Sequence, residues 1–227
     1  MKLKRAFLLT ILFALGLTAI AQPRQDFTKS ADSDPAAKAV LDKVKTKYEA
    51  YQTLEAEFTL TIEIPEQPKE TQAGKLIQKG DQYRLDLQDQ AVISDGQSVW
   101  LYLKKNQEVQ INDAEPEDGE SLSPKDLLRI YETEDFVYAL TNEFVEDGRT
   151  VQQIEFKPLS NDSEYAKIRL TVDKSNSTVK RIKTFAKDGA RYTLEMDKFT
   201  PNKAYPASTF AWSKSECPDC YVEDLRF

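Results

Sequence analysis

Cys217 and Cys220, in the sequence ECPDCY, form a C-x-x-C pair and are the two cysteines of the chain. This spacing occurs in thiol–disulfide redox centres, in metal sites and in structural disulfides. A redox centre needs the first cysteine at the N-terminus of a helix, and the strand-like sequence YVEDLRF that follows does not predict one. A metal site would need further ligands at suitable spacing. We expect a structural Cys217–Cys220 disulfide, and a redox role for Cys217 is the alternative.

Other catalytic chemistry has little support in the composition. The chain contains no histidine, which removes the Ser-His-Asp and Cys-His arrangements and all histidine metal ligands. The acidic stretch DAEPEDGE, residues 113–120, lacks the alternating Asp/Asn ligands and spaced glycine of a calcium loop. It is therefore interpreted as a solvated loop. We predict no catalytic residues, no cofactor and no metal site, and we expect a protein that is not an enzyme.

The first 33 residues have the pattern of an exported protein. Three basic residues precede an apolar run that is too short for the ~20 residues of a membrane-spanning helix, and small residues end it at Ala21. This order predicts a signal peptide over residues 1–21, followed by a polar, disordered leader over 22–33. Residues 34–227 are predicted to form one domain in an exported, oxidising compartment.

The charge excludes some classes of partner. Removing residues 1–21 takes away three of the 31 basic residues and none of the 38 acidic ones, so the net charge changes from −7 to −10. A polyanion is a poor candidate for contacts with the phosphates of nucleic acid or of an anionic membrane. We therefore predict no nucleic-acid partner.

The elements that must position any site are mostly strands. Asp34-Pro35 resembles an N-cap with proline at the first helical position, and helical spacing of apolar residues then predicts a helix over 35–50. A short helix is predicted over 123–131, and residues 134–140 are interpreted as helical or looped. Elsewhere the apolar period is two, which predicts strands at 56–64, 74–79, 82–87, 108–111, 150–158, 166–174, 178–186 and 190–199. A hairpin is predicted over 91–103, and short closing strands are predicted at 209–213 and 222–227.

This pattern of about ten or eleven strands has no alternation of strands with helices. We therefore predict an α+β, mainly β fold. A single curved antiparallel sheet would form an incomplete β-barrel, and the N-terminal helix and short mid-chain helices would cover its concave face.

Five stretches in order resemble the periplasmic outer-membrane lipoprotein carrier family, LolA and LolA-like proteins. They are KYEAYQTLEAEFTLTI, GKLIQKGDQYRLDL, VISDGQSVWLY, LSPKDLL and FAWS…VEDLRF, and the resemblance extends from Pro35 to the C-terminus. It implies an unclosed barrel with a lid of helices, located in the periplasm of a Gram-negative-type envelope. In that family, the cavity receives the acyl chains of lipoproteins released at the inner membrane and delivers them to an outer-membrane acceptor. The acceptor is itself a lipoprotein, so the absence of a cysteine after Ala21 favours the soluble carrier.

The resemblance also nominates residues for an acyl-chain cavity. The strand QYRLDL matches the cavity-facing strand of the family and contributes Tyr83, Leu85 and Leu87. Strand 98–103 is apolar on both faces, and a bulge at 88–90 would break its parity, so either face could line the cavity. We choose the face with Trp100 and Tyr102. The expected apolar contribution of the helical regions is Val40, Leu41, Val44, Leu127, Leu128, Tyr131 and Phe136.

Lys79 stands where proteobacterial family members place an arginine. That arginine bonds to carbonyls of the lid helix and holds the empty lid shut. An ammonium group lacks the planar fork of a guanidinium group, so the resemblance implies a weaker or different lid latch at Lys79.

Together these features predict a monomeric carrier of acylated lipoproteins or other lipid-linked cargo. It would be loaded by a releasing transporter in the inner membrane and unloaded by an outer-membrane acceptor. Three alternatives remain open: a carrier of another acylated lipid, a module that senses lipoproteins, and a thiol–disulfide oxidoreductase that uses Cys217 and Cys220.

Overall fold

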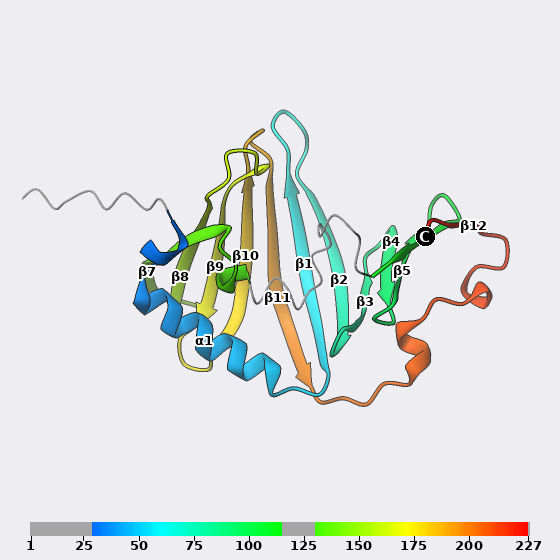
Figure 1. Ribbon diagram of the computed structural model, residues 1–227, viewed down its shortest axis with the longest axis horizontal. Coiled ribbons are helices and arrows are strands. Elements are labelled where there is room, and N and C mark those ends of the chain that lie inside the picture. Colours follow the sequence, from blue (N-terminus) through cyan, green and yellow to red (C-terminus); the bar gives the residue numbers. More distant parts are fainter. Residues whose placement is uncertain (1–28, 115–129, 227) are drawn as a thin grey trace, which may run out of the picture.

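The structure is a computed structural model that describes residues 29–114 and 130–226. Within these ranges the strands form one sheet in the order β12-β6-β5-β4-β3-β2-β1-β11-β10-β9-β8-β7 (Figure 1). Its strands are β1 (Leu54–Glu63), β2 (Glu70–Lys79), β3 (Gln82–Asp86), β4 (Gln90–Ser94), β5 (Ser98–Leu103), β6 (Glu108–Asp113), β7 (Phe136–Glu146), β8 (Arg149–Pro158), β9 (Tyr165–Asp173), β10 (Thr178–Ala186), β11 (Arg191–Pro201) and β12 (Tyr221–Asp224).

The predicted fold class is confirmed: the protein is mainly β, with one open, curved sheet. Neighbouring strands in the described sheet are antiparallel apart from β12 and β6, which run parallel. Hairpin turns explain the antiparallel order, because Gly96, Gly148 and Gly189 all have positive φ in the short connections between strands.

The predicted N-terminal helix is confirmed as α1 (Pro35–Glu49), which lies across β7–β10 in Figure 1. The Asp34 carboxylate accepts hydrogen bonds from the backbone N–H groups of Ala36 (2.8 Å) and Leu140 (3.1 Å). One side chain therefore caps the helix and fastens its N-terminus to β7.

We call the face of the sheet that carries α1 the inner face. Ala37, Leu41 and Val44 of α1 are buried against it. Since residues directly opposite in antiparallel strands share a face, the register defines an apolar row across this face. The row is Leu140, Ile154, Leu170, Ile182, Leu194 and Leu60.

The opposite, outer face differs between the two halves of the sheet. On β8–β11 it is polar, with ion pairs such as Lys167–Glu155 (3.0 Å) and Arg181–Glu195 (2.7 Å). On β2–β6 it carries Ile77, Ile93 and Trp100 instead. The residues after β11 cover this second half.

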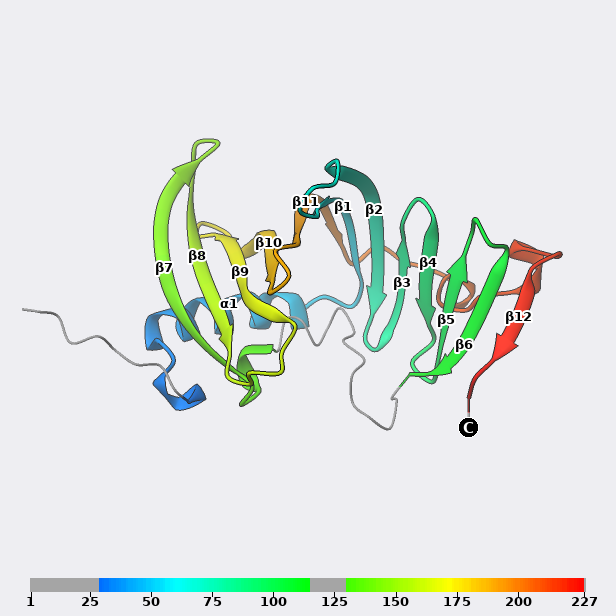
Figure 2. The ribbon, with the colours of Figure 1, turned by 90° about the horizontal axis from the view of Figure 1, so that it is seen from above.

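Residues 202–226, which we call the C-terminal segment, run along the outer face to the edge of the sheet. Figure 2 shows β12 beyond β6, at the end of the sheet opposite to α1. Two 3₁₀ turns, η3 (Ala207–Phe210) and η4 (Lys214–Glu216), precede β12. Phe210 is fully buried. An ion pair between Arg84 and Glu216 (2.8 Å) joins the segment to β3.

The beginning of the C-terminal segment is fixed at β1. The buried Glu55 carboxylate forms ion pairs with Lys75 (2.8 Å) and Lys203 (3.0 Å) and accepts a hydrogen bond from the Tyr205 hydroxyl. The hydrogen bond from Lys75 is the largest of the effects that lower the pKa of Glu55 to about 2, and those from Tyr205 and Lys203 add to it against the effect of burial.

Three local predictions are corrected by the structure. Residues 134–140 include the first part of strand β7, which is explained by ladder pairing with β8. Residues 209–213 are not a strand, because η3 occupies 207–210. The end of the predicted helix over 123–131 is a 3₁₀ turn, η2 (Ile130–Glu132), and its earlier residues lie outside the described ranges.

The end of the predicted leader is ordered in the structure. Ser30–Asp32 form a 3₁₀ turn, η1, and the Ser33 hydroxyl accepts a hydrogen bond from the backbone N–H of Tyr138 (3.2 Å). The residues of the predicted signal peptide lie outside the described ranges. In the part of the chain that the structure describes, no helix combines the length and the apolar character needed to cross a membrane.

Candidate functional site: an apolar pocket beside α1

A pocket of about 190 Å³ lies on the inner face, beside the C-terminal end of α1. It is lined by Tyr48 of α1 and by side chains from the β1, β2, β3, β10 and β11 region of the sheet. Among the described residues, the lining is apolar apart from the Gln78 side chain and the Tyr48 hydroxyl. The described lining residues are Tyr48, Leu54, Ala56, Phe58, Leu60, Leu76, Gln78, Leu85, Leu87, Val179, Ile182, Leu194, Met196 and Phe199.

The curvature of the sheet makes this pocket possible. Leu85 of β3 and Ile182 of β10 line the same pocket, although β2, β1 and β11 separate their strands. In a flat sheet, four steps of ~4.8 Å would place β3 and β10 about 19 Å apart. The sheet therefore curves around the pocket, and the side chains of five strands converge there.

Tyr48 connects the last turn of α1 to the rim of the pocket. Its hydroxyl oxygen accepts a hydrogen bond from the backbone N–H of Val179 (3.1 Å), at an irregular position of the β9–β10 ladder. Burial raises the pKa of the Tyr48 hydroxyl far above its usual value. The side chain therefore stays neutral, so its aromatic body can line an apolar cavity while its polar end is satisfied.

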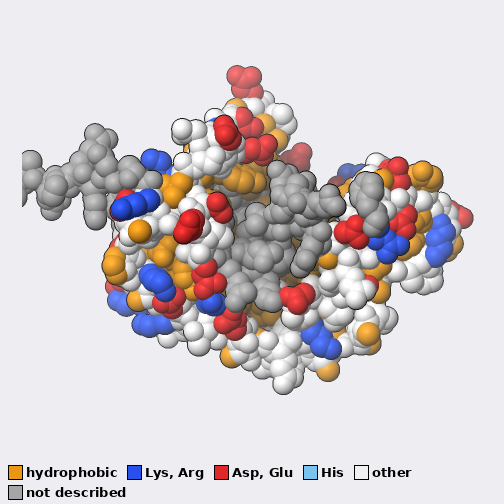
Figure 3. Space-filling view, in the orientation of Figure 1, with side chains coloured by type: hydrophobic (Ala, Val, Ile, Leu, Met, Phe, Trp, Pro, Cys, Tyr) orange, Lys and Arg blue, Asp and Glu red, His pale blue; other side chains and the backbone are white. Residues whose placement is uncertain are grey.

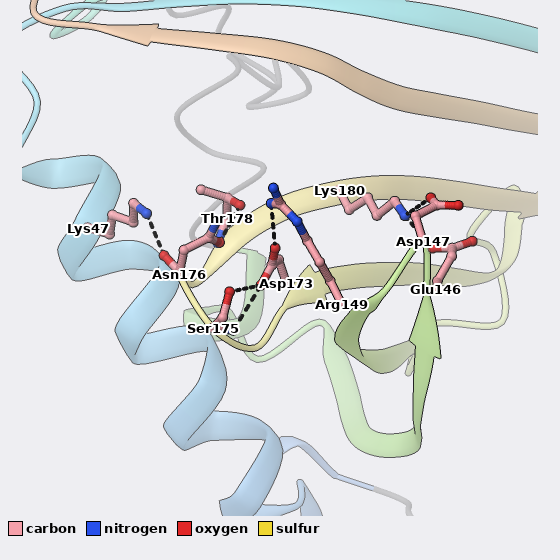
Figure 4. Close-up of polar contacts among 9 residues, drawn as sticks. All are labelled: Lys47, Glu146, Asp147, Arg149, Asp173, Ser175, Asn176, Thr178 and Lys180. Atoms are coloured by element: carbon pink, nitrogen blue, oxygen red, sulfur yellow. Dashed lines mark hydrogen bonds and ion pairs between the residues drawn. The ribbon is translucent and has the colours of Figure 1, made fainter.

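The turn between β9 and β10 supports the same end of α1 (Figure 4). Lys47 donates a hydrogen bond to the backbone carbonyl of Asn176. The Asn176 side chain accepts hydrogen bonds from the backbone N–H (3.0 Å) and hydroxyl (2.6 Å) of Thr178. These contacts fix the turn against the helix, so the position of Tyr48 is set by the sheet.

Asp173 holds the other side of this turn. Its carboxylate accepts hydrogen bonds from the backbone N–H (2.8 Å) and hydroxyl (2.6 Å) of Ser175, and it pairs with Arg149 (3.1 Å; Figure 4). Burial alone would raise the pKa of Asp173, but the hydrogen bonds from Ser175 and Arg149 outweigh it, and the pKa is lowered. The charged carboxylate is therefore a structural part of the turn.

Two of the three residues predicted on strand 82–87 line the pocket. Leu85 and Leu87 belong to the lining, and Leu87 also contacts the region of Gly74. Tyr83 lies on the same face of β3 as Leu85 and is buried, but it is not among the described residues that line this pocket. A role of these side chains in binding acyl chains stays a prediction.

The predicted helical residues belong to the core next to the pocket. Leu41 and Val44 of α1 are buried between the helix and the sheet, and Val40 and Phe136 pack against this core. The buried Tyr131 donates a hydrogen bond from its hydroxyl to Asp42 (3.0 Å) and so joins η2 to α1. Leu127 and Leu128 lie outside the described residues.

The choice of Trp100 and Tyr102 is corrected by the strand register. Leu85 lies opposite Val92, and Val92 lies opposite Leu101, so Leu101 shares the inner face with Leu85. Trp100 and Tyr102 therefore point to the outer face. There they pack in a cluster around Val109, Cys217 and Cys220 that belongs to the C-terminal segment and β6.

The expected latch at Lys79 is also corrected. Side chains two residues apart on a strand point to the same face, so Lys79 lies on the same face as Ile77, which faces the C-terminal segment. The pocket residues Leu76 and Gln78 lie on the opposite face of β2. The exposed Lys79 side chain thus starts from the outer face at the end of β2. It is not placed to hold α1, which is fastened by Asp34, Lys47 and Tyr48 instead.

Cys217 and Cys220 form a disulfide, with 5.3 Å between their Cα atoms. Both are buried, at 7% and 3% exposure, and β12 follows them instead of a helix. The arrangement that activates a thiol in C-x-x-C enzymes is therefore not formed here. Among the described residues, no cluster of acidic and cysteine side chains has the arrangement of a metal site. Most of the acidic stretch 113–120 lies outside those residues.

Sequence reasoning missed most of the lining from β1, β10 and β11. Phe58, Leu60, Leu194 and Met196 were visible as alternating apolar residues of predicted strands. Their convergence depends on the pairing of β1 with β11, which lie about 130 residues apart in the chain. A single sequence carries no direct signal of that pairing.

Comparison with known proteins gives the family. Residues 49–213 match the family model "Outer membrane lipoprotein carrier protein LolA". The match contains every strand that lines the pocket, together with Tyr51 and Phe210, and it ends before the disulfide. No curated protein sequence matches the chain.

Several solved structures are similar to this chain at low sequence identity. An uncharacterized conserved protein from Thermus thermophilus is similar with a TM-score of 0.56 and 14% identity, over 85% of this chain and 99% of that one. A LolA superfamily protein from Nitrosomonas europaea has a TM-score of 0.41 and 13% identity, over 78% and 97% of the two chains. The lipoprotein LppX from Mycobacterium tuberculosis has a TM-score of 0.41 and 10% identity, over 77% and 100%.

The likeness to the protein from Thermus thermophilus, at 14% identity, supports the fold alone. The family model carries the assignment, because it matches well over half of the chain and includes α1's last residue, Glu49, and the whole pocket-lining sheet. The protein belongs to the LolA family of outer membrane lipoprotein carrier proteins.

Proposed function

We propose that this protein is a periplasmic carrier that shields the acyl chains of lipoproteins and ferries them from the inner to the outer membrane. In this proposal it has no catalytic step of its own. An inner-membrane transporter loads it, and an outer-membrane acceptor receives the cargo. The observation that carries the proposal is the apolar pocket on the inner face, whose lining strands lie within the part of the chain that matches the family model.

The physical need for such a pocket is large. Exposing an acyl chain of about 16 carbons to water costs on the order of 12 kcal/mol, at ~0.8 kcal/mol per methylene. A lipoprotein therefore cannot cross an aqueous compartment quickly without a protein that buries its chains. An apolar lining supplies that burial without requiring a specific hydrogen bond from the chain.

The size of the pocket indicates that it would have to enlarge to accommodate cargo. Its volume is about 190 Å³, whereas ligand pockets generally range from about 300 to 1,000 Å³. A complete acyl chain would therefore need additional room, and the pocket must enlarge when cargo enters. A cavity that enlarges on loading and shrinks on release suits a carrier that gives up its ligand to an acceptor.

A carrier of another acylated lipid is the second candidate, and one observation favours it. The described residues of the pocket lining include no charged side chain, so these residues do not distinguish one headgroup from another. Discrimination between lipoproteins and other lipids would then depend on surfaces outside the pocket.

Both candidates can be tested with one competition experiment. The purified protein is saturated with an environment-sensitive apolar dye and titrated with a diacylated lipopeptide, with the same peptide lacking acyl chains, and with a diacyl phospholipid. Displacement by the lipopeptide alone supports lipoprotein transport, and equal displacement by the phospholipid supports the second candidate. A dye that binds without saturation, or that no acylated compound displaces, contradicts both.

A further inference from the structure

Gly74 lies in the middle of β2, directly opposite Phe58 of β1. Its φ is not positive, unlike that of Gly80, Gly96, Gly148 and Gly189. The backbone therefore does not require glycine here, and glycine inside a strand weakens it relative to residues with a side chain. Another feature must account for the missing side chain.

The ring of Phe58 occupies the space that a side chain at position 74 would need. A Cβ atom built on Gly74 would lie 2.3 Å from both Cε2 and Cζ of Phe58, and 2.9 Å from Cδ2 of Leu87. Ordinary contacts of a Cβ atom begin at 3.4 Å, so the ring would have to move by about 1 Å. The ring of Phe58 therefore lies against the bare backbone of β2.

Phe58 and Leu87 both line the apolar pocket, and Phe58 is only 4% exposed. The sheet lies beneath the ring, and Leu87 is in contact with the same position from the side of β3. The remaining direction for a displaced ring is away from the sheet, into the pocket. The space above Phe58 thus exists because residue 74 has no side chain.

We propose that Gly74 sets the depth of the pocket, and with it the length of hydrocarbon chain that the protein accepts, by allowing the Phe58 ring to lie against β2. Gly74 would be a specificity-determining residue that acts through Phe58 without contacting the ligand. The inference rests on the proposed function, because it assumes that the pocket binds hydrocarbon chains.

The size of a phenyl ring relative to the pocket predicts a large effect on chain binding. A cavity of about 150 Å³ is enough to hold a benzene molecule, and this pocket measures about 190 Å³. A phenyl ring that rises into it would therefore take up a substantial part of its volume. Each methylene excluded from the pocket lowers affinity about four-fold, from ~0.8 kcal/mol per buried methylene.

The test measures affinity as a function of chain length. Lysophosphatidylcholines with acyl chains of about 8 to about 16 carbons displace an apolar dye from the wild-type protein and from the variants Gly74→Ala, Phe58→Ala and the double variant. Ala73→Val is the matched control, because Ala73 precedes Gly74 on the same strand, is exposed and has the opposite parity. Circular dichroism and thermal melting confirm that each variant is folded.

In the wild type, affinity should rise with chain length and then level off. In Gly74→Ala, the plateau should begin at a chain shorter by about two or three carbons, which corresponds to about 15- to 60-fold weaker binding of the longest probe. Phe58→Ala should move the plateau to longer chains, and in the double variant the effect of Gly74→Ala should largely disappear. Ala73→Val should keep the wild-type profile.

Two results would separate the inference from the proposed function. If the wild type binds the lipids and Gly74→Ala keeps the same chain-length profile, the role of Gly74 is refuted and the carrier proposal stands. If the wild type binds none of the lipids, the carrier proposal itself fails. If Gly74→Ala does not fold, the chain-length profile of Phe58→Ala tests the inference instead. An unchanged profile in Phe58→Ala would then refute it.

Discussion

The hydroxyl oxygen of Tyr48 accepts a hydrogen bond from the backbone N–H of Val179, and both residues line the same apolar pocket. This contact joins the last turn of α1 to the β10 strand at the rim of the pocket. Loss of this hydrogen bond would be costly, because the buried N–H group of Val179 would be left without a partner.

We expect Tyr48→Phe to lower the free energy of unfolding by about 1–3 kcal/mol, with the apolar lining preserved. Because α1 would be held less firmly at its end, an apolar dye should enter and leave the pocket faster. Urea unfolding and stopped-flow fluorescence measure the two effects. Tyr51→Phe is the control, because no described residue forms a hydrogen bond with the Tyr51 hydroxyl. This variant should change the free energy of unfolding by less than about 0.5 kcal/mol. Equal effects of the two variants would show that the contact with Val179 is unimportant.

Leu85→Glu should strongly weaken binding of apolar dye and of acylated cargo. A carboxylate in the pocket would be desolvated by an entering hydrocarbon chain, and the cost of several kcal/mol per buried charge would cancel much of the free energy that the chain gains there. The half-buried position lets the variant fold, which circular dichroism should confirm. Val145→Glu is the control, because Val145 is 69% exposed on the edge strand β7 and does not line the pocket. Undiminished binding by a folded Leu85→Glu variant would remove β3 from the site.

The double variant Cys217→Ser/Cys220→Ser should lose no more than about 2 kcal/mol of stability, because the disulfide closes a very short loop. Dye binding should not change, since the cysteines lie with Trp100 on the outer face, on the other side of the sheet from the pocket. Denaturation curves and dye titrations of the oxidised wild type and the variant give both values. A large loss of affinity in a folded variant would mean that the C-terminal segment controls the pocket.

The carboxylate of Glu55 should make stability depend on acid pH. Its pKa in the folded protein is about 2, below the ordinary 4.5, because of hydrogen bonds from Lys75, Tyr205 and Lys203. A lowered folded-state pKa stabilises the protein fully above the unfolded-state pKa, and this contribution disappears as the pH falls through the folded-state value. We therefore expect up to about 3 kcal/mol to be lost between pH ~5 and pH ~2.

Urea unfolding at a series of pH values checks this expectation. Glu55→Gln should show a correspondingly flatter profile in that range. Glu57→Gln, at a half-exposed carboxylate that pairs with Lys198 at 3.4 Å, should keep the wild-type slope. If Glu55→Gln has the same slope as the wild type, the acid sensitivity comes from other carboxylates.

The surface charge does not identify a partner. Figure 3 shows acidic and basic side chains interspersed on the described surface of the face in view. The net negative charge disfavours nucleic acid as a partner, but it does not mark a docking site. Loading and receiving partners therefore remain part of the proposal.

Some features were determined by the sequence alone, because they depend on neighbours in the chain. Asp34-Pro35 and the helical spacing that follows predicted α1, which ends at Glu49, next to the predicted end at residue 50. Alternation with a period of two predicted most strands, and the C-x-x-C spacing favoured the disulfide. Local sequence also showed that strand 98–103 is apolar on both faces.

Only the tertiary structure decided which face meets which partner. Trp100 and Leu101 are adjacent in sequence, yet Trp100 packs against the disulfide region and Leu101 shares the inner face with Leu85. That choice depends on register across β3, β4 and β5 and on a C-terminal segment that begins about 100 residues later. The same holds for the pocket, because curvature and the long-range pairing of β1 with β11 bring Leu85 and Phe58 to the same cavity as Met196. Periodicity is a local property of the chain, whereas a cavity arises from packing between segments that the sequence does not order in space.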